Sequence, residues 1–322
     1  MRTNKLLSML LCIPLLVFSM SACTDRKGEK GKIAVIVKAL DSDFWHSVKS
    51  GVDSAAAEYN VNVIFDGPKN EEDYVNQNKL IMSAVKNGAD AIVLSAIDCE
   101  KSVDVVNKAA EKGVKVIIID SNVNSKKVSM FIGTNNADAG RRAGKAAIGC
   151  VPSGEEINIG LINYYKSTEN GIQRENGFRS YIDDVSNANI AVSVNVNSNT
   201  ESVVSAVTAL LAENPEVNVL VGFNEWMTLG IGTAIQHLGL AGKVHVVGFD
   251  TNTAAVGMLE TGVIDTLIVQ NPFAMGYLGV KNATELISGE SVSQKEIYTD
   301  TVAVNRENLF DKDIQKMVFR FN

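Results

Sequence analysis

Acidic, aromatic and amide side chains stand where short apolar runs of the chain end. Asp41 and Asp43 follow the run KIAVIV (32–37) closely, and the aromatic pair Phe44-Trp45 comes directly after them. Later runs end in the same way, at Ser95 to Asp98, Asp120, Asn224, Asp250 and Gln270. Carboxylates accept hydrogen bonds, and amides both donate and accept them. These residue types suit the capture of a small ligand that is rich in hydrogen-bonding groups.

The runs that precede these residues predict the framework that positions them. They are short, β-branched and continuous, which is typical of strands buried on both faces of a parallel sheet. Examples are IAVIV (33–37), VKVIIID (114–120), VNVLVGF (217–223) and VHVVGFD (244–250). Stretches with helical spacing separate the runs, so we expect a doubly wound α/β fold in two similar lobes. Open α/β sheets bind ligands beyond the carboxyl ends of their strands, where the polar groups and rings should meet.

Six of these positions fall in the register of a known family. Phe44-Trp45, Asp120, Arg174 in GIQRENGF, Asn224, Asp250 ending VVGFD, and Gln270 before Asn-Pro share this register. The chain, from about Lys32 to Asn305, resembles the periplasmic sugar-binding proteins of the ribose- and galactose-binding type, whose clan includes the sensory domain of LacI-type repressors. The resemblance implies two Rossmann-like lobes with parallel sheets, joined by three crossings and closing around one sugar.

The resemblance also implies boundaries and a site. Lobe 1 would comprise 32–134 with 271–299, and lobe 2 would comprise 135–270 with 300–322. The expected ligand-binding residues are Asp41, Ser42, Phe44, Trp45, Asp120, Asn136, Arg174, Asn224, Asp250 and Gln270. Asp, Arg and amide groups suit hydroxyls that donate and accept, and the rings suit the apolar faces of a sugar. We expect a monomer that binds a neutral sugar or a sugar-like ligand.

Three contacts depart from the ribose-type pattern. Ser121 stands where those receptors carry an arginine after the strand-end aspartate, and Ser42-Asp43 replaces their asparagine-proline. Ser198 stands where they carry an aromatic residue in the second lobe. These differences point away from ribose itself, toward another pentose, a hexose or a sugar-like signal.

Each site residue also has a purely structural interpretation. Phe44 and Trp45 could pack the first turn of a helix against the sheet. Asp120 and Asp250 could be N-caps of following helices, and Arg174 could form a weak pair on an exposed helix face. An Arg174 that lines an open cleft would be solvated, so its loss would leave the stability of the ligand-free protein nearly intact.

The N-terminus predicts export and anchoring. Residues 1–22 combine basic Arg2 and Lys5 with an apolar stretch and small residues, as in a signal peptide. Cys23 after Ser-Ala resembles a bacterial lipobox, whose cysteine is acylated and becomes the mature N-terminus; the alternative is a plain signal peptide with an incidental cysteine. Residues 23–31 would then be a tether on the outer face of the cell membrane.

Charge and motifs exclude several classes of protein. The net charge of −7 becomes −9 when Arg2 and Lys5 leave with the signal peptide, which argues against a nucleic-acid partner. The pair Gly230-Ile-Gly232 lies inside a helical pattern, so a dinucleotide cofactor is unsupported. No Walker loop or nucleophile elbow occurs, and the three histidines have no metal-ligand spacing, so we expect neither an enzyme nor a metal or cofactor site.

The sequence is compatible with two biological roles for the expected ligand binding. The protein would deliver its ligand to an ABC permease, or it would present the ligand to a membrane sensor kinase or chemoreceptor. The sequence does not separate them, because both partners would use the surface of the closed lobes.

Overall fold

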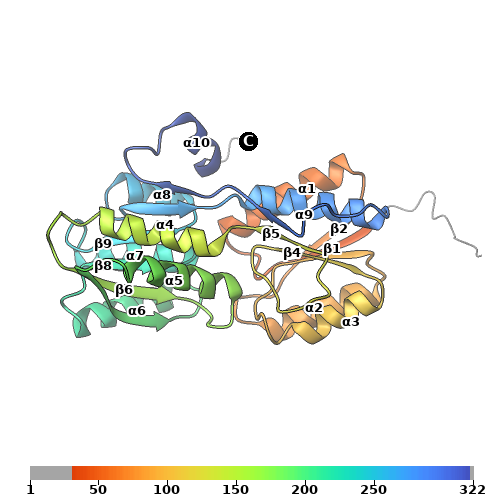
Figure 1. Cartoon of the computed structure of the whole chain (residues 1–322), viewed down its shortest axis with the longest axis horizontal. Coiled ribbons are helices and arrows are strands. Elements are labelled where there is room, and N and C mark those ends of the chain that lie inside the picture. Colours follow the sequence, from red (N-terminus) through yellow and green to blue (C-terminus); the bar gives the residue numbers. More distant parts are fainter. Residues whose placement is uncertain (1–30, 320–322) are drawn as a thin grey trace, which may run out of the picture.

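The computed structural model describes residues 31–319, so the expected signal peptide, Cys23 and most of the tether lie outside the described residues. Two six-stranded sheets lie side by side along the long axis of the molecule (Figure 1). This confirms the predicted α/β fold in two lobes. Within residues 31–319 no helix has the length and apolar character needed to cross a membrane.

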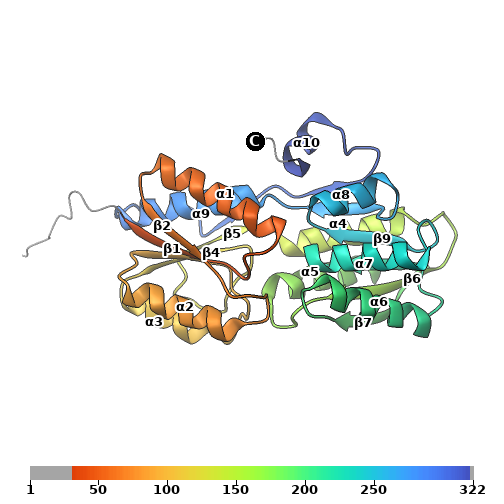
Figure 2. The same cartoon turned by 180° about the vertical axis from the view of Figure 1, so that it is seen from behind.

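The first sheet is parallel throughout and, with its helices, forms lobe 1. Its strands, in spatial order, are β11 (Glu296–Tyr298), β5 (Met130–Gly133), β4 (Lys115–Ile119), β3 (Ala91–Leu94), β1 (Lys32–Ile36) and β2 (Asn62–Asp66). One face is covered by α1 (Asp43–Glu58) and α9 (Pro272–Ile287), and the other by α2 (Tyr74–Lys86) and α3 (Val103–Glu111) (Figure 2). The central strands are buried on both faces, as their continuous apolar runs predict.

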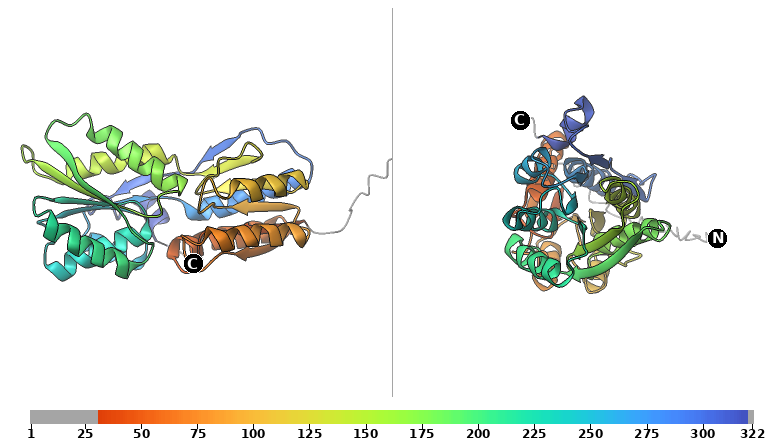
Figure 3. Two further views of the ribbon diagram at one scale, coloured as in Figure 1. Left: turned by 90° about the horizontal axis from the view of Figure 1, so that it is seen from below. Right: turned by 90° about the vertical axis from the view of Figure 1, so that its left-hand side faces the viewer.

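The second sheet and its helices form lobe 2. Its strands, in spatial order, are β12 (Val302–Val304), β10 (Thr266–Val269), β9 (His245–Phe249), β8 (Val219–Gly222), β6 (Ile157–Asn163) and β7 (Ala188–Asn195). Its helices are α4 (Asn136–Gly149), α5 (Glu169–Ile182), α6 (Thr200–Glu213), α7 (Glu225–Leu238) and α8 (Thr253–Glu260). Figure 3 shows α4 and α5 on one side of this sheet and α6 and α7 on the other. Among the strands of residues 31–319, only the edge strand β12 runs antiparallel to its neighbour, a detail that the parallel pattern does not predict.

The chain passes between the lobes three times, as the resemblance implies. The passages connect β5 to α4, β10 to α9, and β11 to β12. A last helix, α10 (Lys312–Val318), packs on the outer side of lobe 2 near α8, and its Val318 belongs to the hydrophobic core of that lobe (Figure 1).

Asparagine side chains set the starts of several helices. Asn135, Asn199, Asn224, Asn252 and Asn271 each accept a backbone N–H three residues further on, which stabilises the first turn of the helix. These turns begin at the carboxyl ends of strands, so the caps also fix the loops that face the other lobe.

Glycines bring paired helices into backbone contact in both lobes. A Cβ on Gly51 of α1 would lie 2.0 Å from the Phe273 carbonyl oxygen of α9, and one on Gly140 of α4 would lie 2.0 Å from the Arg174 carbonyl oxygen of α5. Only glycine permits this approach. The α4–α5 contact therefore positions the backbone of Arg174.

Candidate functional site

A cavity lies between the lobes, beyond the carboxyl ends of the central strands. Both lobes contribute to its lining, which consists of Lys38, Ser42, Phe44, Trp45, Glu71, Asp120, Tyr164, Asn170, Arg174, Asn224, Glu225, Trp226, Asp250 and Gln270. The cavity measures about 20 Å³, little more than a single water molecule needs. The lobes are therefore closed onto their own side chains, which hydrogen-bond one another.

Lobe 1 contributes a buried ion pair. Lys38, which is 4% exposed, lies with its Nζ 3.1 Å from Oδ2 of Asp120. Asp120 also accepts hydrogen bonds from Ser95 Oγ at 2.8 Å and, across the cleft, from Asn170 Nδ2 at 2.9 Å. Burial disfavours the charge on Lys38, but the carboxylates of Asp120 and Glu71 outweigh it and raise the pKa of Lys38. The pair thus places a fixed positive charge and a fixed acceptor side by side.

The aromatic pair forms one wall of the cavity and also packs into the core. Phe44 and Trp45 meet edge to face, with ring centroids 4.9 Å apart, and Trp45 is 1% exposed. Both belong to the core cluster beneath α1. The indole Nε1 of Trp45 donates to Glu71 Oε1 at 2.9 Å. The two rings therefore pack against the core, as the structural interpretation expects, and they also line the cavity, as the ligand-binding interpretation expects.

Lobe 2 contributes a linked set of polar groups around Arg174. The guanidinium donates to Asn136 Oδ1 at 2.9 Å, to the Phe223 carbonyl at 2.7 Å and to Gln270 Oε1 at 2.7 Å. Gln270 Nε2 in turn donates to Asp250 Oδ1 at 2.6 Å. Arg174 is 1% exposed, which rules out the exposed-pair interpretation. Because all three of its acceptors belong to lobe 2, the expectation of a solvated, loosely held Arg174 is wrong.

The two strand-end aspartates share an unusual backbone. Asp120, after β4, has φ 58°, and Asp250, after β9, has φ 70°. Residues other than glycine rarely adopt this left-handed region, although aspartate and asparagine tolerate it best. Asp250 does not cap α8, because Asn252 does so. In both lobes the strained turn directs a carboxylate into the cavity.

Burial changes the protonation of Asp250. Desolvation raises its pKa from 3.8 to about 7, although Arg174 and Gln270 favour the ionised form. Gln270 is also bonded by Thr134 Oγ1, from the first passage between the lobes, at 2.8 Å. Asp250 is therefore coupled through Gln270 to the segment that joins the lobes.

Glu225 holds the closed lobes together. Its carboxylate, at the start of α7, accepts hydrogen bonds from the backbone N–H groups of Asp43 at 3.3 Å and Phe44 at 3.1 Å. These N–H groups belong to the first turn of α1, where the helix dipole favours a negative charge. Burial raises the pKa of Glu225. A lobe 2 carboxylate thus stabilises a lobe 1 helix only when the cleft is closed.

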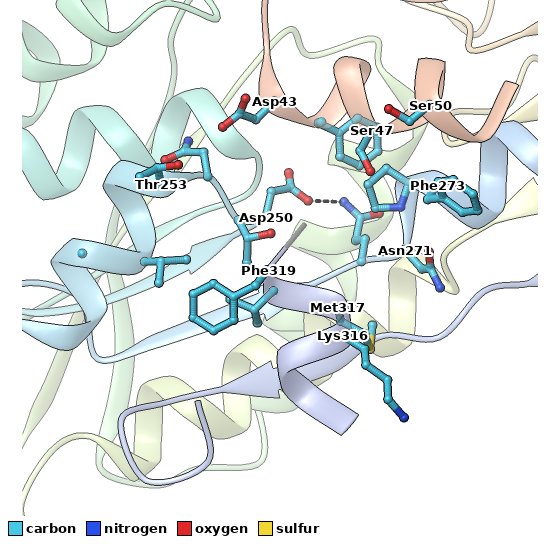
Figure 4. Close-up of a pocket in the computed structure, with 18 of the residues that line it drawn as sticks. Asp43, Ser47, Ser50, Asp250, Thr253, Asn271, Phe273, Lys316, Met317 and Phe319 are labelled. Carbon is cyan, nitrogen blue, oxygen red and sulfur yellow. Dashed lines mark hydrogen bonds between the residues drawn. The ribbon is translucent and has the colours of Figure 1, made fainter. Parts of the chain in front are cut away.

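A larger groove borders the cavity. It measures about 980 Å³, lies between α1, α8 and α10, and shares Phe44, Asp250 and Gln270 with the cavity. Figure 4 shows Asp250 and its hydrogen bond to Gln270 at the groove, with Phe319 nearby. Asp250 therefore lines both the cavity and the larger groove.

The family comparison agrees with this geometry. The model of the periplasmic binding protein domain matches residues 33–291. The chain belongs to the periplasmic binding protein family. This family consists of solute-binding proteins that act outside the cytoplasm, so the chain is not an enzyme. Its relatives identify it further as a sugar-binding member of the ribose- and galactose-binding type.

Three relatives illustrate the likeness. The D-ribose/D-allose-binding protein of Pseudomonas aeruginosa is 28% identical over 280 residues, covering 84% of this chain and 87% of that protein. A solute-binding protein of Agrobacterium radiobacter in complex with D-arabinose is 28% identical, with a TM-score of 0.88, and the match covers 90% of this chain and 99% of that chain. A solute-binding protein of Agrobacterium vitis with bound D-fucose is 33% identical, with a TM-score of 0.86, over 90% and 100% of the two chains.

The structure of this periplasmic binding protein brings together most of the expected site residues. Eight of the ten line the cavity: Ser42, Phe44, Trp45, Asp120, Arg174, Asn224, Asp250 and Gln270. Asn136 lies behind Arg174 and holds its Nε. Asp41 is exposed and is absent from the lining, so its expected contact is not supported by this geometry.

Several lining residues escaped the sequence analysis. Lys38 directly follows the apolar run 33–37 and lies two residues after the end of β1, so a charge at a strand's carboxyl end could have revealed it. Tyr164 directly follows β6 and carries the same signal, whereas Glu71 lies in a loop and Asn170 lies at the start of α5, where no strand end marks them. Tyr164 and Trp226 supply rings from lobe 2, whereas Ser198, at the expected aromatic position, bonds Glu72 through its backbone N–H.

Proposed function

We propose that this chain captures a neutral monosaccharide between its lobes and delivers it to an ABC permease. The observation that carries the proposal is the convergence of two polar sets on one cavity with aromatic walls. Lys38 with Asp120 comes from lobe 1, and Arg174 with Gln270 and Asp250 comes from lobe 2. Charged donors and acceptors of this kind form the stronger hydrogen bonds to hydroxyl groups.

The ligand class follows from the relatives and the residues. The relatives named above bind D-ribose and D-allose, D-arabinose or D-fucose. Lys38 and Arg174 oppose the carboxylates of the cavity, which favours a neutral polyol over an anion. Ser121, Ser42-Asp43 and Ser198 differ from the ribose-type pattern, so we do not assign ribose.

A thermal-shift screen of pentoses, hexoses and polyols tests the ligand class. A sugar at a hundredfold its Kd should stabilise the protein by about 2.7 kcal/mol, which raises Tm by roughly 5–10 °C. Lys38→Met should abolish the shift, whereas Lys49→Met, on the exposed face of α1, should keep it. If no sugar shifts Tm, or if both variants respond alike, the proposed site is wrong.

We also propose hinge closure between lobes bounded at 134/135, 270/271 and 299/300. Ligand should replace the contacts that hold the closed lobes, such as Asn170 to Asp120. Solution scattering should show a monomer that contracts when the confirmed sugar is added to the ligand-free protein. A profile that stays unchanged would count against closure.

The anchor and the output form a separate part of the proposal. Acylation of Cys23 would hold the protein at the outer face of the membrane, within reach of a permease. Signalling through a sensor kinase or chemoreceptor is the second candidate. One similar solved structure, at 26% identity and a TM-score of 0.79, is described as the XylFII-LytSN complex, so that relative binds a protein partner. Cells that lack the chain should lose uptake of the labelled sugar. Normal uptake with a lost transcriptional response would favour signalling instead.

A further inference from the structure

Three potential metal ligands meet at the end of lobe 2 that lies away from the cavity. Cys150 ends α4, His245 begins β9, and Asp265 directly precedes β10. Strands β9 and β10 are parallel neighbours, so their first residues lie at the same edge of the sheet. One ligand atom from each of the three side chains lies within 4.8 Å of the others. Sequence spacing does not reveal this group, because almost a hundred residues separate Cys150 from His245.

The carboxylate of this cluster is held in place. Asp265 Oδ2 accepts the backbone N–H of Val246 at 2.8 Å, and the backbone N–H of Asp265 donates to the Val246 carbonyl at 2.9 Å. Oδ1 is thereby directed toward His245, whose Nδ1 lies 3.2 Å away. Two zinc ligands with bonds of about 2.0–2.1 Å stand roughly 3.3 Å apart in a tetrahedral site. The observed separation fits one edge of such a site without rearrangement.

The surroundings of Cys150 favour a cation. The thiol donates to the Ala147 carbonyl at 3.2 Å, and the nearby Asp265 carboxylate supplies a negative charge that a cation would neutralise. Coordination by a divalent cation stabilises the thiolate. The C-terminal end of α4 also presents backbone carbonyl groups, which attract positive charge. His245 and Asp265 are each 19% exposed, so an ion can enter from solvent.

We propose that Cys150, His245 and Asp265 bind a divalent cation of the zinc class, with water as the fourth ligand. Sulfur, imidazole and carboxylate together suit Zn²⁺ or Co²⁺ and not Mg²⁺ or Ca²⁺. In a tetrahedral site the sulfur stands roughly 3.6 Å from the other two ligand atoms, and all three atoms already lie within 4.8 Å of one another. The ion would join the end of α4 to two strands of lobe 2. It would stabilise that lobe without contacting the sugar.

Cobalt spectroscopy tests the proposal on the full chain, prepared without a histidine tag and freed of metal by EDTA. One equivalent of Co²⁺ should give tetrahedral visible bands and a thiolate-to-cobalt charge-transfer band, and Zn²⁺ should displace both. Cys150→Ser should remove the charge-transfer band, whereas Cys99→Ser, at the other described free thiol, should keep it. His245→Gln should weaken Co²⁺ binding by roughly 100-fold or more.

Two results would overturn the site. One is a wild-type protein without the charge-transfer band, and the other is a band that survives in Cys150→Ser, since the ion would then bind another thiol. Circular dichroism must show that each variant is folded. Asp265→Asn, which keeps an oxygen for the Val246 N–H, serves as a second variant if Cys150→Ser does not fold. Sugar affinity should stay the same with and without Zn²⁺.

Discussion

Replacing Arg174 by alanine should destabilise lobe 2 even without ligand. The guanidinium holds Asn136 Oδ1, the Phe223 carbonyl and Gln270 Oε1, and it lies 4.7 Å from the centre of the Phe249 ring. All four partners belong to lobe 2, so opening the cleft does not release these contacts. The destabilisation should therefore appear in the ligand-free protein.

The magnitude follows from the acceptors left behind. Gln270 Oε1 keeps its bond from Thr134, but Asn136 Oδ1 and the Phe223 carbonyl lose the partners named above. Each buried acceptor without a partner costs about 1–3 kcal/mol. Two of them give a total of roughly 4 kcal/mol, which is in the range for removing one partner of a buried charged pair. For a protein of this size that loss lowers Tm by on the order of 10 °C.

Calorimetry of the ligand-free protein measures this loss, and the same helix supplies a control. Arg179 of α5 is 39% exposed and pairs with Glu175 at 2.6 Å. Arg179→Ala should cost less than about 1 kcal/mol, as exposed pairs do. If the two variants lower Tm equally, Arg174 is not held within lobe 2. Sugar affinity, measured below the Tm of both variants, should fall only for Arg174→Ala.

Three further outcomes are expected. Trp45→Phe should reduce sugar affinity and abolish most of the ligand-induced change in tryptophan emission, because Trp45 lines the cavity and donates to Glu71. Trp226→Phe should keep the larger part of the emission change. The reverse pattern would show that Trp45 is not the ligand-facing ring. Burial raises the pKa of Asp250 from 3.8 to about 7. Protonated Asp250 therefore stabilises the closed, ligand-free form, and this stabilisation is fully present below pH 4 and is lost as the pH rises to 7. Urea unfolding should show this loss in the wild type and a smaller one in Asp250→Asn, while parallel pH profiles would refute the assigned shift. Cys23→Ser should release the protein from membranes without changing its sugar affinity, and retention in the membrane fraction would contradict acylation at Cys23.

The fold class and eight of the fourteen residues that line the cavity could be predicted before the structure was known. Continuous β-branched runs predict strands that are buried on both faces, and the residue that follows each strand must lie at the ligand-binding edge of a parallel sheet. This rule alone brings Asp120 and Asp250 to the cavity. The register of Arg174 and Gln270 came from the family resemblance.

The division of these side chains into those that line the cavity and those that support them follows from the packing of whole elements, which local sequence patterns do not report. Asn136 and Arg174 both belong to the expected set, yet Asn136 holds Arg174 from behind. Glu225 reaches the N-terminus of α1 in the other lobe because the two lobes lie against each other, and no local pattern records that arrangement.

The proposed metal ligands illustrate the same limit. Cys150, His245 and Asp265 come from the end of one helix and the starts of two strands, and the order of the strands in the sheet brings them together. Local patterns report neighbours along the chain, because hydrophobic periodicity depends on burial of each element. Contacts between loops depend on strand order and on lobe closure, which are properties of the whole fold.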